Sequence, residues 1–300
     1  MAKVEMFQIV VFDWNEEKEI LELVSFGSGT AVSSGAILTS KHVVQAEDGS
    51  FADFILLCQA QANAGESAVC NIPAGVSAAH DIEDVALIRP IENKFFPKVK
   101  VSYQKKRVED PIRVLGFPTP EAGKLGFGDT KTVSIFETWL NDTTQPLSVE
   151  GDKLTVTRGQ VQARLKNKDT GFTYTKTDAK VNFGNSGGAA FDEYGEYLGI
   201  VTFKDKVGNS IFLEYHQIDQ WVRAYQSKAA TFDQAAYDFY KKTQTPTKKK
   251  VSEELTLQQR IEALRSRQMR TKSTSRQGRV LTPKQIRLYE YLRQKRLRKD

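Results

Sequence analysis

Short apolar runs alternate with turn residues along the first two thirds of the chain. Between residues 6 and 110 the runs are rich in Val, Ile, Phe and Thr, and clusters of Gly, Asn, Asp and Ser separate them. Residues 112–215 show the same alternation of apolar runs and turn residues. Runs that recur at intervals of about 8 to 15 residues, with turn signals between them, are typical of an all-β barrel or sandwich. The pattern therefore predicts two β units of similar size, side by side.

The apolar period becomes helical after the last of these runs. Ile218, Trp221, Val222 and Tyr225 recur at three- and four-residue spacing. This spacing places them on one face of a short helix over about 216–227, packed against the barrel.

These changes of pattern predict the domain organisation. We expect one folded domain over residues 1–228, with a first barrel over about 1–106, a second over about 110–215 and the closing helix at 216–227. A helical connector and linker is expected over 229–247, and a basic helical tail over 248–300. In that tail Ser252 and Thr282 are the expected N-caps of two helices.

The net charge of +6 conceals an asymmetry between the body and the tail. Residues 248–300 hold 17 Lys or Arg against 5 Asp or Glu, a net of +12, so residues 1–247 carry −6. Such a tail suits phosphate backbones, anionic lipid or an acidic partner. The alternative is a solvated, partly helical extension that serves solubility or self-association.

No apolar run approaches the length of about 18 to 20 residues that a membrane-spanning helix needs. The N-terminal residues lack a basic region and a small-residue cleavage site, so we expect a cytoplasmic protein. Cys58 and Cys70 are too few for a disulfide framework. They flank a turn around residues 63–65, which makes a cross-strand pair geometrically possible, but for an unexported protein we expect reduced, partly buried thiols.

Three short segments carry the candidate chemistry, in the order His, Asp, Ser. His42 follows an apolar strand and is the candidate general base, and Asp84 precedes the strand-like run VALI and is suited to accept the other ring N–H of the His. Ser186 lies in the run Gly-Asn-Ser-Gly-Gly, where small residues let the backbone turn sharply and expose a nucleophilic hydroxyl. The backbone amides of Gly184 and Ser186 can converge on a carbonyl oxygen as an oxyanion hole.

Three charged or polar neighbours of Asp84 have a simpler interpretation. We expect Asp81 and Glu83 to be solvated loop charges and His80 to be an exposed neighbour of the catalytic carboxylate.

These segments together resemble a known family. The pieces GSGTAV, ILTSKHVV, DVALI, VLGFP and TDAKVNFGNSGGAAFDEYGEYLGIVTF resemble trypsin-like serine peptidases of the chymotrypsin superfamily, closest to the HtrA/DegP-type and V8-type bacterial enzymes. The resemblance implies a mainly β fold of two antiparallel six-stranded β-barrels, with His42 and Asp84 from the first barrel and Ser186 from the second. The implied activity is hydrolysis of peptide bonds in extended polypeptide through an acyl-enzyme, without a cofactor or metal.

The resemblance also implies where substrate binds. Thr202, Phe203 and Lys204 would form the edge strand that pairs with the substrate backbone. Asn185, where trypsin has Asp, argues against zymogen cleavage, and Lys180, where a trypsin-like pocket has Asp, argues against cleavage after Lys or Arg. At the pocket entrance Lys204 would favour an acidic side chain before the scissile bond; the alternative is that Lys204 points to solvent, as most Lys do.

HtrA-type enzymes usually carry an export signal and a PDZ domain, and neither is recognisable in this sequence. This departure would also suit a product of a viral or phage polyprotein. The alternative function is a binding or assembly protein that keeps the protease fold while its basic tail binds nucleic acid or another anionic partner.

Overall fold

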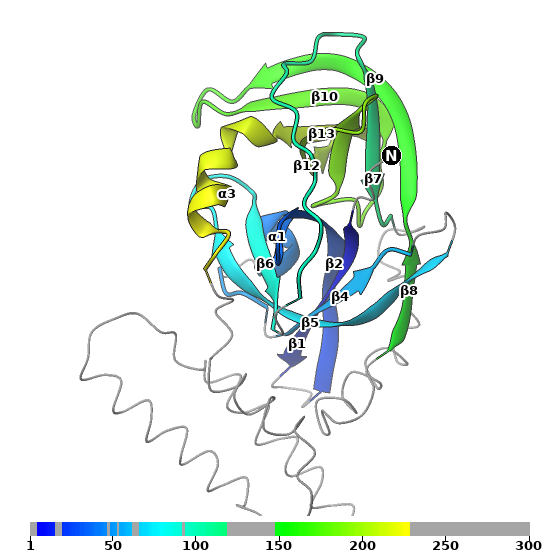
Figure 1. Ribbon diagram of the computed structural model, residues 1–300, viewed down its shortest axis with the longest axis vertical. Helices are drawn as coiled ribbons and strands as arrows, with labels where there is room; N and C mark the ends of the chain where they lie inside the picture. The colour runs from blue at the N-terminus through cyan, green and yellow to red at the C-terminus, as the bar shows by residue number, and fades with distance from the viewer. Residues whose placement is uncertain are drawn as a thin grey trace, which may run out of the picture.

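The computed structural model describes residues 5–15, 20–46, 49–52, 54–61, 66–91, 94–118 and 148–228. Within them the chain forms two β-barrels, one above the other in Figure 1, with helix α3 beside them. The mainly β, chymotrypsin-like architecture expected from the sequence is confirmed. The expected connector at 229–247 and the basic tail at 248–300 lie outside the described residues, so their helices and partners stay predictions.

The first barrel is antiparallel and has the strand order β4-β1-β2-β3-β6-β5, closed by pairing of β4 with β5. Its strands are β1 Met6–Asn15, β2 Ile20–Ser33, β3 Ala36–Thr39, β4 Phe54–Gln59, β5 Ser67–Ala79 and β6 Ala86–Pro90. The first strand reads as an almost continuous apolar run because both of its faces are buried. Met6 and Val10 join one core cluster, whereas Phe7 and Ile9 join another.

The second barrel closes in the order β10-β13-β12-β11-β7-β9. Its strands are β7 Pro111–Gly116, β9 Thr155–Lys166, β10 Thr173–Lys180, β11 Ala189–Asp192, β12 Tyr197–Lys204 and β13 Asn209–Glu214. One strand within the range expected for this barrel joins the first barrel instead, because β8 (Val149–Lys153) pairs with β5. Gln8 of β1 supports that pairing, since its side-chain amide donates to Asp152 Oδ2 at 2.6 Å and its Oε1 accepts from the Asp152 N–H at 2.8 Å.

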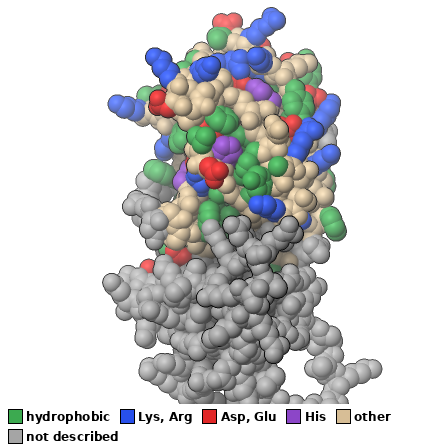
Figure 2. All heavy atoms as spheres, turned by 90° about the vertical axis from the view of Figure 1, so that its left-hand side faces the viewer, with side chains coloured by type: hydrophobic (Ala, Val, Ile, Leu, Met, Phe, Trp, Pro, Cys, Tyr) green, Lys and Arg blue, Asp and Glu red, His purple; other side chains and the backbone are tan. Residues whose placement is uncertain are grey.

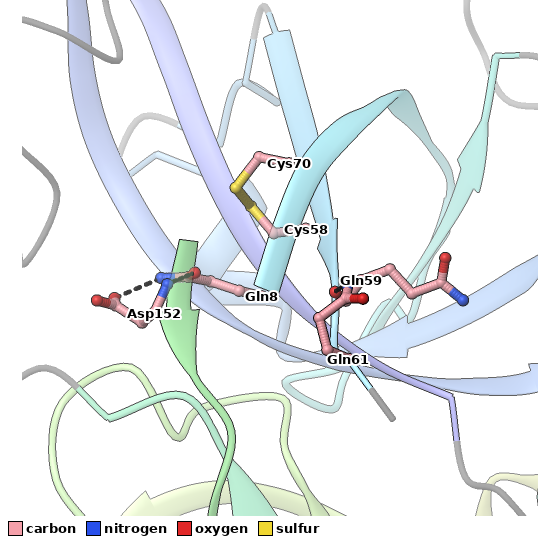
Figure 3. Close-up of a disulfide and its surroundings, with 6 residues drawn as sticks. All are labelled: Gln8, Cys58, Gln59, Gln61, Cys70 and Asp152. Carbon is pink, nitrogen blue, oxygen red and sulfur yellow. Dashed lines mark hydrogen bonds between the residues drawn. A yellow bond between two sulfur atoms is a disulfide. The ribbon is translucent and has the colours of Figure 1, made fainter. Parts of the chain in front are cut away.

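Cys58 and Cys70 form a disulfide between β4 and β5 (Figure 3). The expectation of reduced thiols is wrong, because the strand register places the two residues directly opposite each other. Both side chains are fully buried. The disulfide therefore links the two strands whose pairing closes the first barrel.

The closing helix is shorter than its expected range. A 3-10 turn over Tyr215–Gln217 leads into α3, Asp219–Tyr225, whose Val222 is buried in a cluster shared by both barrels. The end of α3 is tied to the first barrel, where Arg89 Nη1 donates to the Gln226 carbonyl at 2.5 Å. Among the described residues, no helix has both the length and the apolar character needed to cross a membrane.

Candidate active site

His42 and Asp84 are joined by two hydrogen bonds. His42 lies in the one-turn helix α1, Lys41–Val44, which follows β3 directly, and Asp84 lies just before β6. The His42 N–H donates to Asp84 Oδ1 at 2.9 Å, and the ring Nδ1 lies 2.7 Å from Oδ2. The His42 side chain is 49% exposed and that of Asp84 17%. This carboxylate fixes both the backbone and the ring of His42 and leaves Nε2 available for proton transfer.

Ser186 lies in a tight loop between β10 and β11. Gly184 and Gly187 have φ of 87° and 83°, a backbone conformation that favours glycine. A Cβ at Gly187 would lie 2.1 Å from the Ser28 carbonyl oxygen, so a side chain does not fit there. The loop is also held from the second barrel, where the Gly187 N–H donates to the Val201 carbonyl at 2.7 Å.

Strand β2 brings the Ser186 loop against the His42 helix. The Ser28 N–H donates to the Ser186 carbonyl at 2.8 Å. A Cβ at the neighbouring Gly27 would meet Val43 Cγ2 at 2.6 Å and the same Ser186 carbonyl at 2.9 Å. Since Val43 follows His42 directly, the structure gathers the segments that carry His42, Asp84 and Ser186 at the junction of the two barrels.

The amides expected to form an oxyanion hole lie in the same loop. The amide nitrogens of Gly184 and Ser186 donate to no backbone carbonyl among the described residues. The Gly184 carbonyl accepts from Ser28 Oγ at 2.7 Å, which anchors the loop to the first barrel. Two N–H groups left available in one fixed loop are suited to stabilise a developing oxyanion.

Residues 202–204 form a strand segment with one side unpaired among the described strands. β11 pairs with β12 only as far as Ile200, whereas β13 continues to Lys204. Thr202 is buried, and Phe203 and Lys204 are exposed. An extended polypeptide can therefore add along the unpaired side.

The two lysines expected near the substrate have protein partners. Lys204 Nζ lies 3.9 Å from the centroid of the Phe183 ring. Lys180 Nζ donates to the Val207 carbonyl at 3.1 Å and to Asn209 Oδ1 at 2.6 Å. Lys180 is thus engaged by the turn between β12 and β13, while Lys204 lies close to the segment that leads to Ser186.

The expectation that Glu83 is solvated is wrong. Glu83 is only 3% exposed, and its Oε2 accepts a hydrogen bond from the hydroxyl of Tyr174 on β10. Asp81 is exposed, as expected. No local pattern marks Glu83, because the residue that buries it lies in the other barrel.

His80 is also more than an exposed neighbour. It is half-buried, with its ring against those of Phe172 and Trp221 at centroid distances of 5.7 and 5.3 Å. Its Nδ1 accepts from the N–H groups of Ile82 and Glu83 at 3.2 and 3.0 Å, so the ring shapes the loop that leads to Asp84. Burial lowers the pKa of His80, an effect that the carboxylates of Glu83 and Asp81 oppose.

A pocket of about 510 Å³ opens beside Asp84. Residues of the Asp84 loop line one side and residues of the second barrel the other, including Ile82, Glu83, Leu165, Tyr174 and Phe203. Figure 2 shows His, acidic and hydrophobic side chains gathered on the face that carries α3. The pocket combines an apolar wall with carboxylates and adjoins the exposed segment of β12.

The sequence of the chain is similar to that of a known serine protease. The chain is 27% identical over 210 residues to serine protease HTRA3 of Rattus norvegicus, covering 68% of this chain and 38% of that protein. It therefore spans well under half the length of that relative.

Two solved structures match the chain. The active form of the Rv3671c protease of M. tuberculosis matches with a TM-score of 0.51 at 17% identity, over 75% of this chain and 82% of that one. The serine endoprotease of Yersinia pestis matches with a TM-score of 0.47 at 21% identity, over 73% and 62% of the two chains.

The family model described as a trypsin-like peptidase domain matches residues 27–200. That range contains His42, Asp84 and Ser186 and more than half of the chain. The chain belongs to the trypsin-like peptidase family.

Proposed function

We propose that this chain is a serine endopeptidase with Ser186 as nucleophile, His42 as general base and Asp84 as the group that orients His42. The observation that carries the proposal is the pair of hydrogen bonds from His42 to Asp84, next to the glycine-rich Ser186 loop. Family membership and the serine protease among its relatives support it.

The proposed reaction has two halves. Ser186 Oγ attacks the peptide carbonyl carbon while His42 Nε2 takes the hydroxyl proton, and the imidazolium returns that proton to the leaving nitrogen as the C–N bond breaks. Water then attacks the resulting ester, with His42 again taking and returning a proton, and the carboxylic acid leaves. The amides of Gly184 and Ser186 stabilise the oxyanion in each half.

The proposed substrate is an extended segment of polypeptide that adds to residues 202–204 of β12. The side unpaired among the described strands supports this placement. Lys204 favours an acidic side chain before the scissile bond, since its ammonium lies beside the Ser186 loop. A peptide library should show enrichment of Asp or Glu at that position, reduced in Lys204→Ala; cleavage without that preference would reject the role of Lys204.

A fluorophosphonate probe tests the nucleophile without knowledge of the natural substrate. We expect covalent labelling of the wild-type chain, no labelling of Ser186→Ala and a loss on the order of 10³-fold or more in His42→Ala. Ser148→Ala, which changes an exposed serine, is the matched control and should label normally. A folded wild-type chain that does not label would instead favour the alternative function, a binding or assembly protein that keeps the protease fold.

A further inference from the structure

Glu83 directly precedes Asp84 and is a buried carboxylate that the proposed reaction does not use. Its Oε2 accepts from the Tyr174 hydroxyl, while its Oε1 is buried without a partner in the described part of the chain. Burial of a carboxylate disfavours folding unless hydrogen bonds or opposite charges compensate for the lost hydration. The Tyr174 hydrogen bond thus compensates in part for the burial of the Glu83 side chain.

Tyr174 reaches Glu83 from the other barrel. It lies on β10, 91 residues away in sequence, and its ring packs at 6.0 Å from that of Phe203 on β12. Burial and the neighbouring Glu83 raise the pKa of Tyr174, so its hydroxyl keeps its proton and donates at neutral pH. The hydrogen bond therefore joins the loop that carries Asp84 to the barrel that carries Ser186.

The loop leaves little freedom between Glu83 and Asp84. The N–H of Glu83 donates to His80 Nδ1, and the Glu83 carbonyl accepts from the Val85 N–H at 2.8 Å. Asp84 lies between these two anchored points, and both of its oxygens are hydrogen-bonded to His42. A displacement of Glu83 would be transmitted to both of these bonds.

We propose that Glu83 and Tyr174 are positioning residues that hold Asp84 in register with His42, an inference that rests on the proposed function of this site. Neither side chain touches the reacting atoms in this role. Their hydrogen bond sets the distance between the Asp84 loop and the second barrel. Misplacement of a catalytic group by about 1 Å can reduce the rate on the order of 10²-fold.

The test uses the full chain and the rate constant for fluorophosphonate modification of Ser186. Tyr174→Phe removes the donor and keeps the ring, and we expect a rate about 10- to 100-fold lower, as for loss of one hydrogen bond to a charged group. Tyr194→Phe is the matched control, because Tyr194 is 76% exposed, and should react at the wild-type rate. A wild-type rate in Tyr174→Phe would overturn the proposal.

A second readout separates positioning from general loss of structure. The proton on His42 Nδ1, held by Asp84, should give a downfield NMR resonance in wild type. We expect this resonance to shift or broaden in Tyr174→Phe, while the dispersed methyl resonances of the two cores persist. An unchanged His42 resonance would overturn the positioning role.

The two residues should also act as one unit. If so, the double variant Tyr174→Phe, Glu83→Gln reacts with the probe no more slowly than the slower of the two single variants. A rate reduction equal to the product of the two single reductions would contradict the pairing. Should Tyr174→Phe not fold, Glu83→Gln decides alone. It keeps an acceptor but weakens the bond, so a shifted resonance and a slower reaction support the proposal, and wild-type values reject it.

The NMR readout needs no reaction at Ser186. A chain that shows the resonance but never labels would contradict the proposed function. Sensitivity of the same resonance to Tyr174→Phe would still support the positioning role, so the two failures are distinguishable.

Discussion

Gly27 of β2 lies between the His42 helix and the Ser186 loop. The contacts that a Cβ would make there, with Val43 and with the Ser186 carbonyl, leave no room for a side chain. A side chain at this position would therefore push the His42 helix and the Ser186 loop apart. At the same scale, the half-buried His80 shapes the backbone that precedes Asp84.

His80 predicts a pH dependence of stability. Burial is the main cause that lowers its folded-state pKa below the ordinary value of 6.5. The unfolded chain therefore binds the proton more readily, and the stability due to neutral His80 is full above pH 6.5 and is lost as pH falls toward the folded-state pKa.

We expect the urea midpoint of wild type to decrease on acidification from about pH 7 to pH 5, where unperturbed histidines titrate. His80→Gln, which does not titrate, should show a smaller decrease. His216→Gln is the comparison variant, since His216 lies in the 3-10 turn before α3, 32% exposed and 3.5 Å from Glu214. Equal slopes in wild type and His80→Gln would contradict the role of burial at His80.

At the scale of elements, closure of the first barrel depends on β4 and β5. These strands are distant from each other along the sheet order and meet only because the sheet curls round. The Cys58–Cys70 disulfide joins them at this seam, and β8 covers the same region through Gln8 and Asp152, as Figure 3 shows.

The disulfide should contribute to stability. It links residues 12 apart, and a cross-link over a loop of this size stabilises by about 2 to 4 kcal/mol, chiefly by restricting the unfolded chain. We expect the free energy of unfolding of the doubly substituted Cys58→Ala, Cys70→Ala chain to be lower by that amount, and its urea midpoint to be lower accordingly. Reductant should lower the midpoint of wild type but not of the double variant, and a wild-type midpoint insensitive to reductant would show that the thiols are free in solution.

At the scale of the whole molecule, the two barrels share both a core and a site. One cluster of buried side chains includes Met6 and Leu38 of the first barrel with Ile200 and Leu213 of the second. Ser28 adds a polar contact across this junction. Its Oγ donates to the Gly184 carbonyl at 2.7 Å and accepts from the Phe117 N–H at 2.9 Å.

Ser28→Ala should therefore reduce stability and activity together. It leaves a buried carbonyl and a buried N–H without their partner, at a cost of about 1 to 3 kcal/mol in the free energy of unfolding, and it frees the loop that carries Ser186. Urea unfolding and fluorophosphonate labelling measure the two effects. Ser210→Ala is the matched control, because Ser210 is equally buried but its Oγ has no partner among the described atoms, and it should unfold near the wild-type midpoint. Equal behaviour of the two variants would contradict the bridging role of Ser28.

The sequence by itself determined the class of fold and the segments of the candidate active site. The apolar runs predict strands because the side chains that a strand buries recur within a few residues along the chain. The glycine-rich turn around Ser186 is likewise a requirement of the local backbone. His42 and Asp84 each adjoin such a run, so their segments could be identified without their partners.

Only the tertiary structure decided which neighbours are buried and which strands meet. Glu83 and Asp81 look alike in sequence, yet one is covered by Tyr174 from the other barrel and the other is exposed. Barrel closure likewise places Cys58 opposite Cys70, and β8 beside β5. Burial and pairing depend on residues far along the chain, and no periodicity within a single segment encodes them.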